Sequence, residues 1–136
     1  MNLVEKLIAV DKKEFDKIER KAIPSKRLSK LLGEDEAEVI IQAVEGDLFG
    51  GLSASGLDED GEVDYSRIFS TNAKIVAAGV VEPDLKNEAL LKHLGVATPA
   101  EAAKKIFAGE INKISAEISS LSGFESDEKT DKKVKN

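Results

Sequence analysis

The sequence predicts a mainly α-helical fold: a single small helical domain with a minor β-hairpin or strand element in its N-terminal half. Apolar residues recur every three or four positions over most of the second half of the chain, which is the spacing of a helix face packed on a core. Aromatic residues make up 4% of the 136 residues, so the core must be built from Leu, Ile, Val and Ala. A chain of this length supports one domain with a modest core.

The N-terminal region begins with a predicted helix over residues 2–10. Asn2 can cap this helix, and Glu5 stands at the capping-box position. Residues 11–21 are compatible with either a continued helix or a strand. A second short helix is expected after them, ending at Gly33, because three leucines form a helical stripe: Leu28, Leu31 and Leu32.

Residues 39–44 are the one segment with a convincing strand pattern, since β-branched residues follow one another over a typical strand length. A strand needs a partner for its backbone groups, and residues 19–23 are the best candidate. The two would form a hairpin that encloses the leucine helix. Residues 47–54 are expected to form a short helix, and residues 55–64 a loop.

Four helices are predicted in the second half. The first begins at Tyr65 and is closed by Pro83, and the second carries leucines and ends at Gly95. The third has the strongest start signal: Thr98 caps it, Pro99 occupies its first turn, and Glu101 is placed to reach back to the Thr98 amide. After a bend at Gly109, the fourth helix carries one apolar stripe and ends at Gly123; its members are Ile111, Ile114, Ile118 and Leu121.

The stripe on the last helix has two interpretations. It is either part of the domain core or an interface, because a narrow three-four seam is also typical of a coiled-coil contact. If apolar surface is left over after the core is packed, the C-terminal end of this helix is the first candidate for partner binding. The residues expected to contact a partner there are Ile118, Leu121 and Phe124.

The domain is expected to span residues 1–124, followed by a charged tail over residues 125–136. Eight of the twelve tail residues are charged, and Val134 is the one aliphatic residue among them. Such a segment cannot bury enough apolar surface to offset the entropy lost on ordering. We therefore expect the tail to be disordered.

Charge and composition narrow the function classes. The net charge is −6, which argues against nucleic acid as the main partner, although basic residues gather between Lys12 and Lys30. That basic patch leaves one alternative open, a small helical regulator that binds nucleic acid. There is no cysteine, no apolar run long enough to cross a membrane, and no signal-peptide pattern. We expect a cytoplasmic protein.

No enzyme motif, cofactor site or metal site is predicted. The acidic loop around Asp58 and Asp64 partly resembles a calcium loop, but aligning Gly61 to the invariant glycine places Gly56 at the first ligand and Arg67 at the last. A solvated turn is the better interpretation. His93 is the sole histidine, so an imidazole-rich metal set is excluded.

Two regions together resemble a known family. The first combines residues 26–33 with residues 39–44, and the second runs from Val81 through Thr98-Pro99-Ala100-Glu101 and Gly109-Glu110-Ile111 to Phe124. In order and spacing, these segments resemble the XkdN-like tail assembly chaperones of phages and prophages, over about residues 20–124. The resemblance implies a non-catalytic assembly factor in the bacterial host that is absent from the finished virion. Its implied partner is the long, hydrophobic tape-measure protein, with the tail tube protein and self-association as further options.

Overall fold

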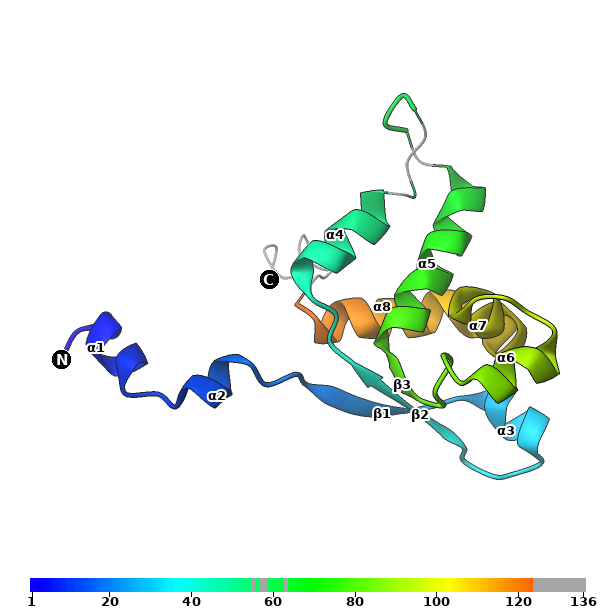
Figure 1. The fold of residues 1–136 in the computed structure, drawn as a ribbon, viewed down its shortest axis with the longest axis horizontal. Coiled ribbons are helices and arrows are strands. Elements are labelled where there is room, and N and C mark those ends of the chain that lie inside the picture. The colour runs from blue at the N-terminus through cyan, green and yellow to red at the C-terminus, as the bar shows by residue number, and fades with distance from the viewer. Residues whose placement is uncertain (55, 57–58, 63, 124–136) are drawn as a thin grey trace, which may run out of the picture.

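The computed structural model describes residues 1–54, 56, 59–62 and 64–123 (Figure 1). The predicted disordered tail, residues 125–136, lies outside the described residues, as does Phe124. The mainly α-helical prediction with a minor strand element is confirmed. The elements follow in the order α1 (Leu3–Ile8), α2 (Lys12–Phe15), β1 (Arg20–Pro24), α3 (Lys26–Leu32), β2 (Glu38–Gln42), α4 (Gly46–Ala54), α5 (Tyr65–Gly79), β3 (Val80–Glu82), α6 (Glu88–Leu94), α7 (Pro99–Phe107), a 3-10 turn η1 (Ala108–Glu110) and α8 (Ile111–Leu121).

The predicted hairpin is present. β1 and β2 pair antiparallel, with Arg20 opposite Gln42 and Pro24 opposite Glu38, and α3 forms part of their connection. The Ser25 hydroxyl caps α3 by accepting a hydrogen bond from the backbone N–H of Leu28 at 3.0 Å. Gly33 ends the helix in the left-handed conformation, with φ of 66°, which glycine adopts without steric cost.

A third strand, β3, was not predicted. The sequence pattern extends the helix of Tyr65 to Pro83, whereas α5 ends at Gly79 and the next three residues pair with β2. The apolar spacing continues through Val80, so periodicity does not show where the helix stops. Pairing satisfies backbone groups on the second edge of β2, which the hairpin alone leaves open. The sheet order is β1-β2-β3, antiparallel throughout.

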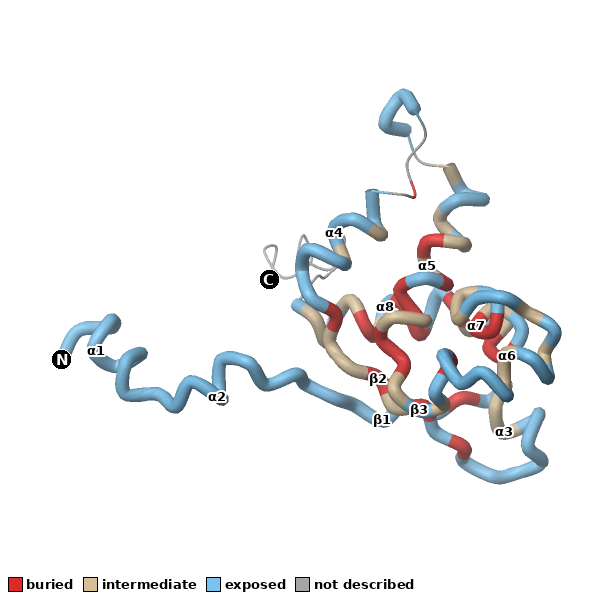
Figure 2. Tube along the Cα trace, in the orientation of Figure 1, coloured by how far each residue is buried: buried red, intermediate tan, exposed pale blue. Residues whose placement is uncertain are grey.

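The core lies between the sheet and the helices α5, α7 and α8 (Figure 2). Val39 and Ile41 of β2 are completely buried, and so are Phe107 of α7 and Ile118 of α8. The cap of α7 is formed as predicted, since Thr98 Oγ1 accepts from the Glu101 N–H at 3.2 Å. The Glu101 carboxylate accepts from the N–H of Ala97, one residue earlier than expected.

Residues 1–19, called here the N-terminal arm, extend away from this core (Figures 1 and 2). Asn2 caps α1 as predicted, its Oδ1 accepting from the Glu5 N–H at 2.9 Å. Every residue of the arm is nevertheless exposed, and neither α1 nor α2 contains a buried residue. The packed body of the protein begins at β1.

Candidate partner-binding surface

The residues predicted to contact a partner differ in how far they are exposed. Ile118 is completely buried, so the expectation of leftover surface is wrong for this residue, and the core interpretation of the stripe is correct there. Leu121 is half-buried at the end of α8, and partner binding by it stays a prediction. The stripe is buried because α5 lies along it, while the opposite side of α8 is exposed at Asn112, Lys113 and Ala116.

Apolar side chains do form a depression elsewhere, between α3, α6 and the adjoining ends of β2 and β3. This α3–α6 groove has a volume of ≈ 520 Å³, which is in the size range of binding clefts. Its apolar walls come from α3, α6 and α7: Leu28, Leu31, Leu32, Leu90, Leu94 and Ile106. Its edge carries three exposed carboxylates, Glu34, Glu38 and Glu82, and the exposed His93.

Two contacts fix the α3 wall of the groove against the body. The Arg27 guanidinium donates to the backbone carbonyls of Ile106, at 3.3 Å, and Lys105, at 3.4 Å, in the last turns of α7. A cation is favourable at this end of a helix because the unpaired carbonyls carry partial negative charge. The buried Ser25 hydroxyl donates to the Glu110 carboxylate at 2.5 Å and thereby ties the start of α3 to η1.

The α6 wall is defined by local signals at both ends of the helix. Asn87 Oδ1 accepts from the Leu90 N–H at 3.0 Å, and Gly95 closes the helix with φ of 70°.

Leu31 and Leu32, on the α3 wall of the groove, keep 53% and 55% of their surface exposed, although both are in a formed helix beside the core. Apolar walls with an acidic edge suit an apolar helical segment that carries lysine or arginine beside its apolar face.

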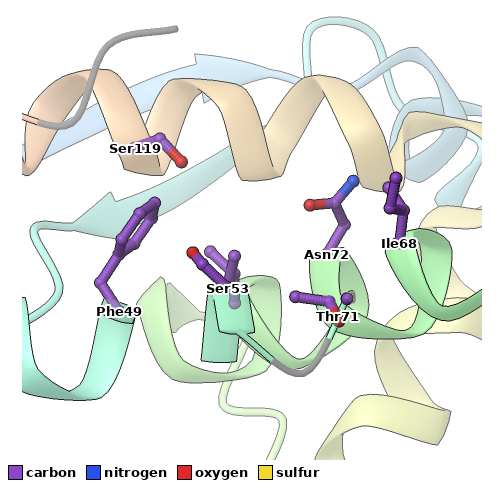
Figure 3. Close-up of a pocket in the computed structure, with 8 residues that line it drawn as sticks. Phe49, Ser53, Ile68, Thr71, Asn72 and Ser119 are labelled. Carbon is purple, nitrogen blue, oxygen red and sulfur yellow. The ribbon is translucent and has the colours of Figure 1, made fainter. Parts of the chain in front are cut away.

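A second depression lies between α4, α5 and α8 (Figure 3). It is smaller, ≈ 280 Å³, and its lining mixes Phe49 and Ile68 with hydroxyl and amide groups. Asn72 points from α5 toward α8, where its Nδ2 donates to Asn112 at 2.8 Å and its Oδ1 accepts from the Ser115 hydroxyl at 3.0 Å. These polar groups join two helices, so we regard the α3–α6 groove as the stronger candidate.

The basic stretch from Lys12 to Lys30 is distributed over several elements. Its residues are divided among the N-terminal arm, β1 and α3. Lys17 pairs with Glu14 at 3.0 Å, Lys21 with Glu117 at 3.0 Å, and Arg27 binds backbone carbonyls. This arrangement does not favour the nucleic-acid alternative, which would need a continuous positive patch.

The acidic loop contributes a helix cap. Asp64 accepts hydrogen bonds from the Ser66 hydroxyl at 2.7 Å and from the backbone N–H groups of Ser66 and Arg67 at the start of α5. The Ser66 hydroxyl is the main cause that lowers the pKa of Asp64; partial desolvation opposes it, and the two N–H groups and the Arg67 charge add to the lowering. Asp58 of the same loop lies outside the described residues.

The described part of the chain lacks two kinds of feature. Within residues 1–54, 56, 59–62 and 64–123, no three His, Asp or Glu side chains gather in a way that could hold a metal ion. Over the same residues, no helix has the length and apolar character needed to cross a membrane.

The fold and the groove define the chain as a small helical domain, built on a three-stranded sheet, with an apolar groove on its surface. The family model for the phage XkdN-like tail assembly chaperone protein matches residues 4–136, and the chain belongs to this family. The family predicted from residues 20–124 is therefore confirmed, and the match includes most of the N-terminal arm.

Comparison with solved structures places the fold beside a crystal structure of the protein YqbN. The two chains are 22% identical, with a TM-score of 0.58, and the match covers 79% of this chain and 87% of that one. This likeness shows a shared fold. No curated protein sequence matches the chain.

Proposed function

We propose that this protein is a non-catalytic tail assembly chaperone that binds an apolar helical segment of the tape-measure protein in the α3–α6 groove. It would act in the bacterial cytoplasm and be absent from the finished virion. The observation that supports the proposal best is the exposure of Leu31 and Leu32 on the wall of an apolar groove, in a chain of the tail assembly chaperone family.

The physical basis is the burial of apolar surface on both partners. A tape-measure chain that is not yet enclosed by the tail tube exposes apolar helix faces, and such faces aggregate unless they are covered. An amphipathic helix in an apolar groove covers them. Full burial of one leucine side chain contributes about 1.5–3 kcal/mol, so Leu31 and Leu32, each about half exposed, can add substantially to binding.

Co-expression tests this proposal. The cognate tape-measure protein is expected to stay soluble and to co-purify when the two are produced together. Leu31→Asp or Leu32→Asp would place a charge against the apolar partner, where an unpaired charge is costly, and should abolish co-purification. Leu48→Asp is the matched control, because Leu48 is exposed to a similar extent, 49%, but lies on α4.

Circular dichroism of each free variant separates loss of binding from loss of folding. If the tape-measure protein is equally soluble without this chain, the chaperone proposal is wrong. If Leu48→Asp abolishes binding as well as Leu31→Asp does, the contact does not depend on the groove.

Leu121 is the second candidate contact, retained from the sequence prediction. It is half-buried, so part of its side chain faces outward at the end of α8. In the same co-purification assay, Leu121→Asp is expected to weaken binding less than Leu31→Asp does.

A further inference from the structure

The edge of the α3–α6 groove carries charge of one sign. Three exposed carboxylates line it, and the described part of the chain places no lysine or arginine among its lining residues. Glu34 follows α3, Glu38 begins β2 and Glu82 ends β3. Within the same described residues, none of the three side chains takes part in an ion pair. Their charges are therefore available to a partner.

The register of the sheet brings two of these carboxylates to one place. Ile40 of β2 stands opposite Glu82 of β3, and Glu38 is two residues before Ile40, on the same face of its strand. Val39 and Ile41 are completely buried on the other face. Diagonal neighbours on antiparallel strands are about 7–8 Å apart, a distance over which two like charges still repel each other. A cation supplied by a partner would relieve this repulsion.

The lysines of the two wall helices do not offset the acidic edge. Successive residues of a helix are about 100° apart, so Lys26 and Lys30 lie on the side of α3 opposite to the leucines of the wall. Lys92 stands midway between Leu90 and Leu94 and so lies on the far side of α6 in the same way. The groove is thus a leucine-lined surface bordered by negative charge.

We propose that the groove selects its tape-measure segment by charge, with Glu34, Glu38 and Glu82 as the specificity-determining residues. It would accept an amphipathic helix whose apolar face is bordered by lysine or arginine, and reject one bordered by aspartate or glutamate. The inference rests on the proposed function, which supplies the groove and the partner. Burial of leucine is non-directional and does not distinguish one apolar helix from another. Charges at the rim do, because like charges penalise the wrong partner.

Two synthetic peptides test this selection. Both have the same leucine face on a helix; one carries lysine at the positions beside that face, and the other carries glutamate there. Fluorescence anisotropy measures the binding of each labelled peptide to the full chain. We expect the lysine peptide to bind at least about tenfold more tightly at roughly 50 mM salt, and the difference to shrink at roughly 0.5 M salt, where exposed charges are screened.

Charge reversal assigns the preference to particular residues. The double variant Glu38→Lys with Glu82→Lys should bind the glutamate peptide more tightly than the lysine peptide. Glu45→Lys with Glu59→Lys is the matched control: it changes the net charge equally, at two exposed residues outside the groove, and should keep the original preference. Leu31→Asp should weaken the binding of both peptides. Circular dichroism checks that each variant is folded.

The cognate tape-measure protein provides a second measurement. When overlapping peptides that cover its sequence are probed with the full chain, those retained should have lysine or arginine beside an apolar helix face. In co-expression, the Glu38→Lys, Glu82→Lys variant should lose the tape-measure protein, and the control variant should retain it.

Several results would overturn the inference. Equal binding of the two peptides would do so, as would a preference that the edge variant leaves unchanged or that the control variant reverses. If Leu31→Asp still abolishes binding in those cases, the groove accepts apolar helices whatever their charge, and the proposed function stands. If neither peptide binds, the inference is wrong, and co-purification with Leu31→Asp decides the proposed function separately.

Discussion

At Gly79, the last residue of α5, the backbone lies directly against Ile118 of α8. A methyl group added at its Cα would lie 2.6 Å from Cδ1 and 2.8 Å from Cγ2 of Ile118, well inside van der Waals contact. Ile118 is completely buried and cannot move outward. This contact explains why Ile118 belongs to the core, and why the chain has glycine where α5 ends and β3 begins.

Replacing this glycine should destabilise the protein. Gly79→Ala is expected to lower the free energy of unfolding by about 1–3 kcal/mol, the usual cost of overpacking a core. Gly50→Ala is the matched control, because a Cβ at position 50 of α4 meets no atom within 4 Å. It should instead stabilise the helix by up to about 1 kcal/mol. Urea denaturation measures both; equal effects of the two substitutions would contradict the packing described.

The Ser25–Glu110 contact shows what a residue-level prediction from sequence lacks. The capping role of Ser25 is a local property, since its acceptor oxygen and the Leu28 N–H are three residues apart. Its donor bond to Glu110 joins residues 85 positions apart, and nothing in the local pattern of either residue indicates the other. Long-range side-chain contacts of this kind depend on the finished packing.

Among the helices and strands, the sequence predicts the elements whose own residues include start and stop signals. The Thr98 cap with Pro99 and the glycine at the end of α3 are such signals, and both are confirmed. The β1–β2 pairing follows because an apolar β-branched strand needs a partner and one candidate lies nearby. β3 has no such signal: Val80 continues the helical spacing of α5, and its strand conformation is set by β2.

The sequence predicts one wall of the α3–α6 groove but not the groove itself. The leucine stripe of α3 is recognisable, yet its spacing does not distinguish a helix that buries its leucines from one that leaves Leu31 and Leu32 exposed. The second wall lies more than fifty residues later, in α6, and the two walls meet through the fold. One clue is available: α3 is a short helix with three leucines, inserted into a small hairpin that offers little surface to cover them.

The cap of α5 should make stability depend on pH through Asp64. Its pKa is lowered in the folded state, so the folded chain binds a proton less readily than the unfolded one. The stabilisation is therefore fully present above the ordinary aspartate pKa and is lost as the pH falls through the lowered folded value. Asp64→Asn keeps a capping oxygen and removes the titrating group.

We expect the melting temperature of the unaltered chain to exceed that of Asp64→Asn at pH 7, and the gap to narrow below about pH 3. Thermal melts at several pH values measure this difference. Asp64→Ala, which removes the cap itself, should melt lower than both near neutral pH. A gap that widens in acid would mean that the carboxylate is not stabilised in the folded state.

For the whole molecule, burial predicts an uneven distribution of local stability. β2, α7 and α8 contain completely buried residues, whereas α1, α2 and α4 contain no buried residue. In dilute solution, amide hydrogen exchange should be fast in the latter group and slowest in β2 and the last two helices. Exchange followed by mass spectrometry measures this order. Slow exchange of α1 would contradict this order and would show that the N-terminal arm is held by its own chain.

The position of β2 in the chain has a consequence for synthesis. Val39 and Ile41 share one buried cluster with Ile114 and Ile118 of the last helix, which contacts β2 although it follows more than seventy positions later. As the ribosome extends the chain from its N-terminus, the hairpin emerges long before α8 exists to cover it. The apolar face of the sheet therefore stays open to water during most of translation. The nascent protein acquires its native core only when its final helix leaves the exit tunnel.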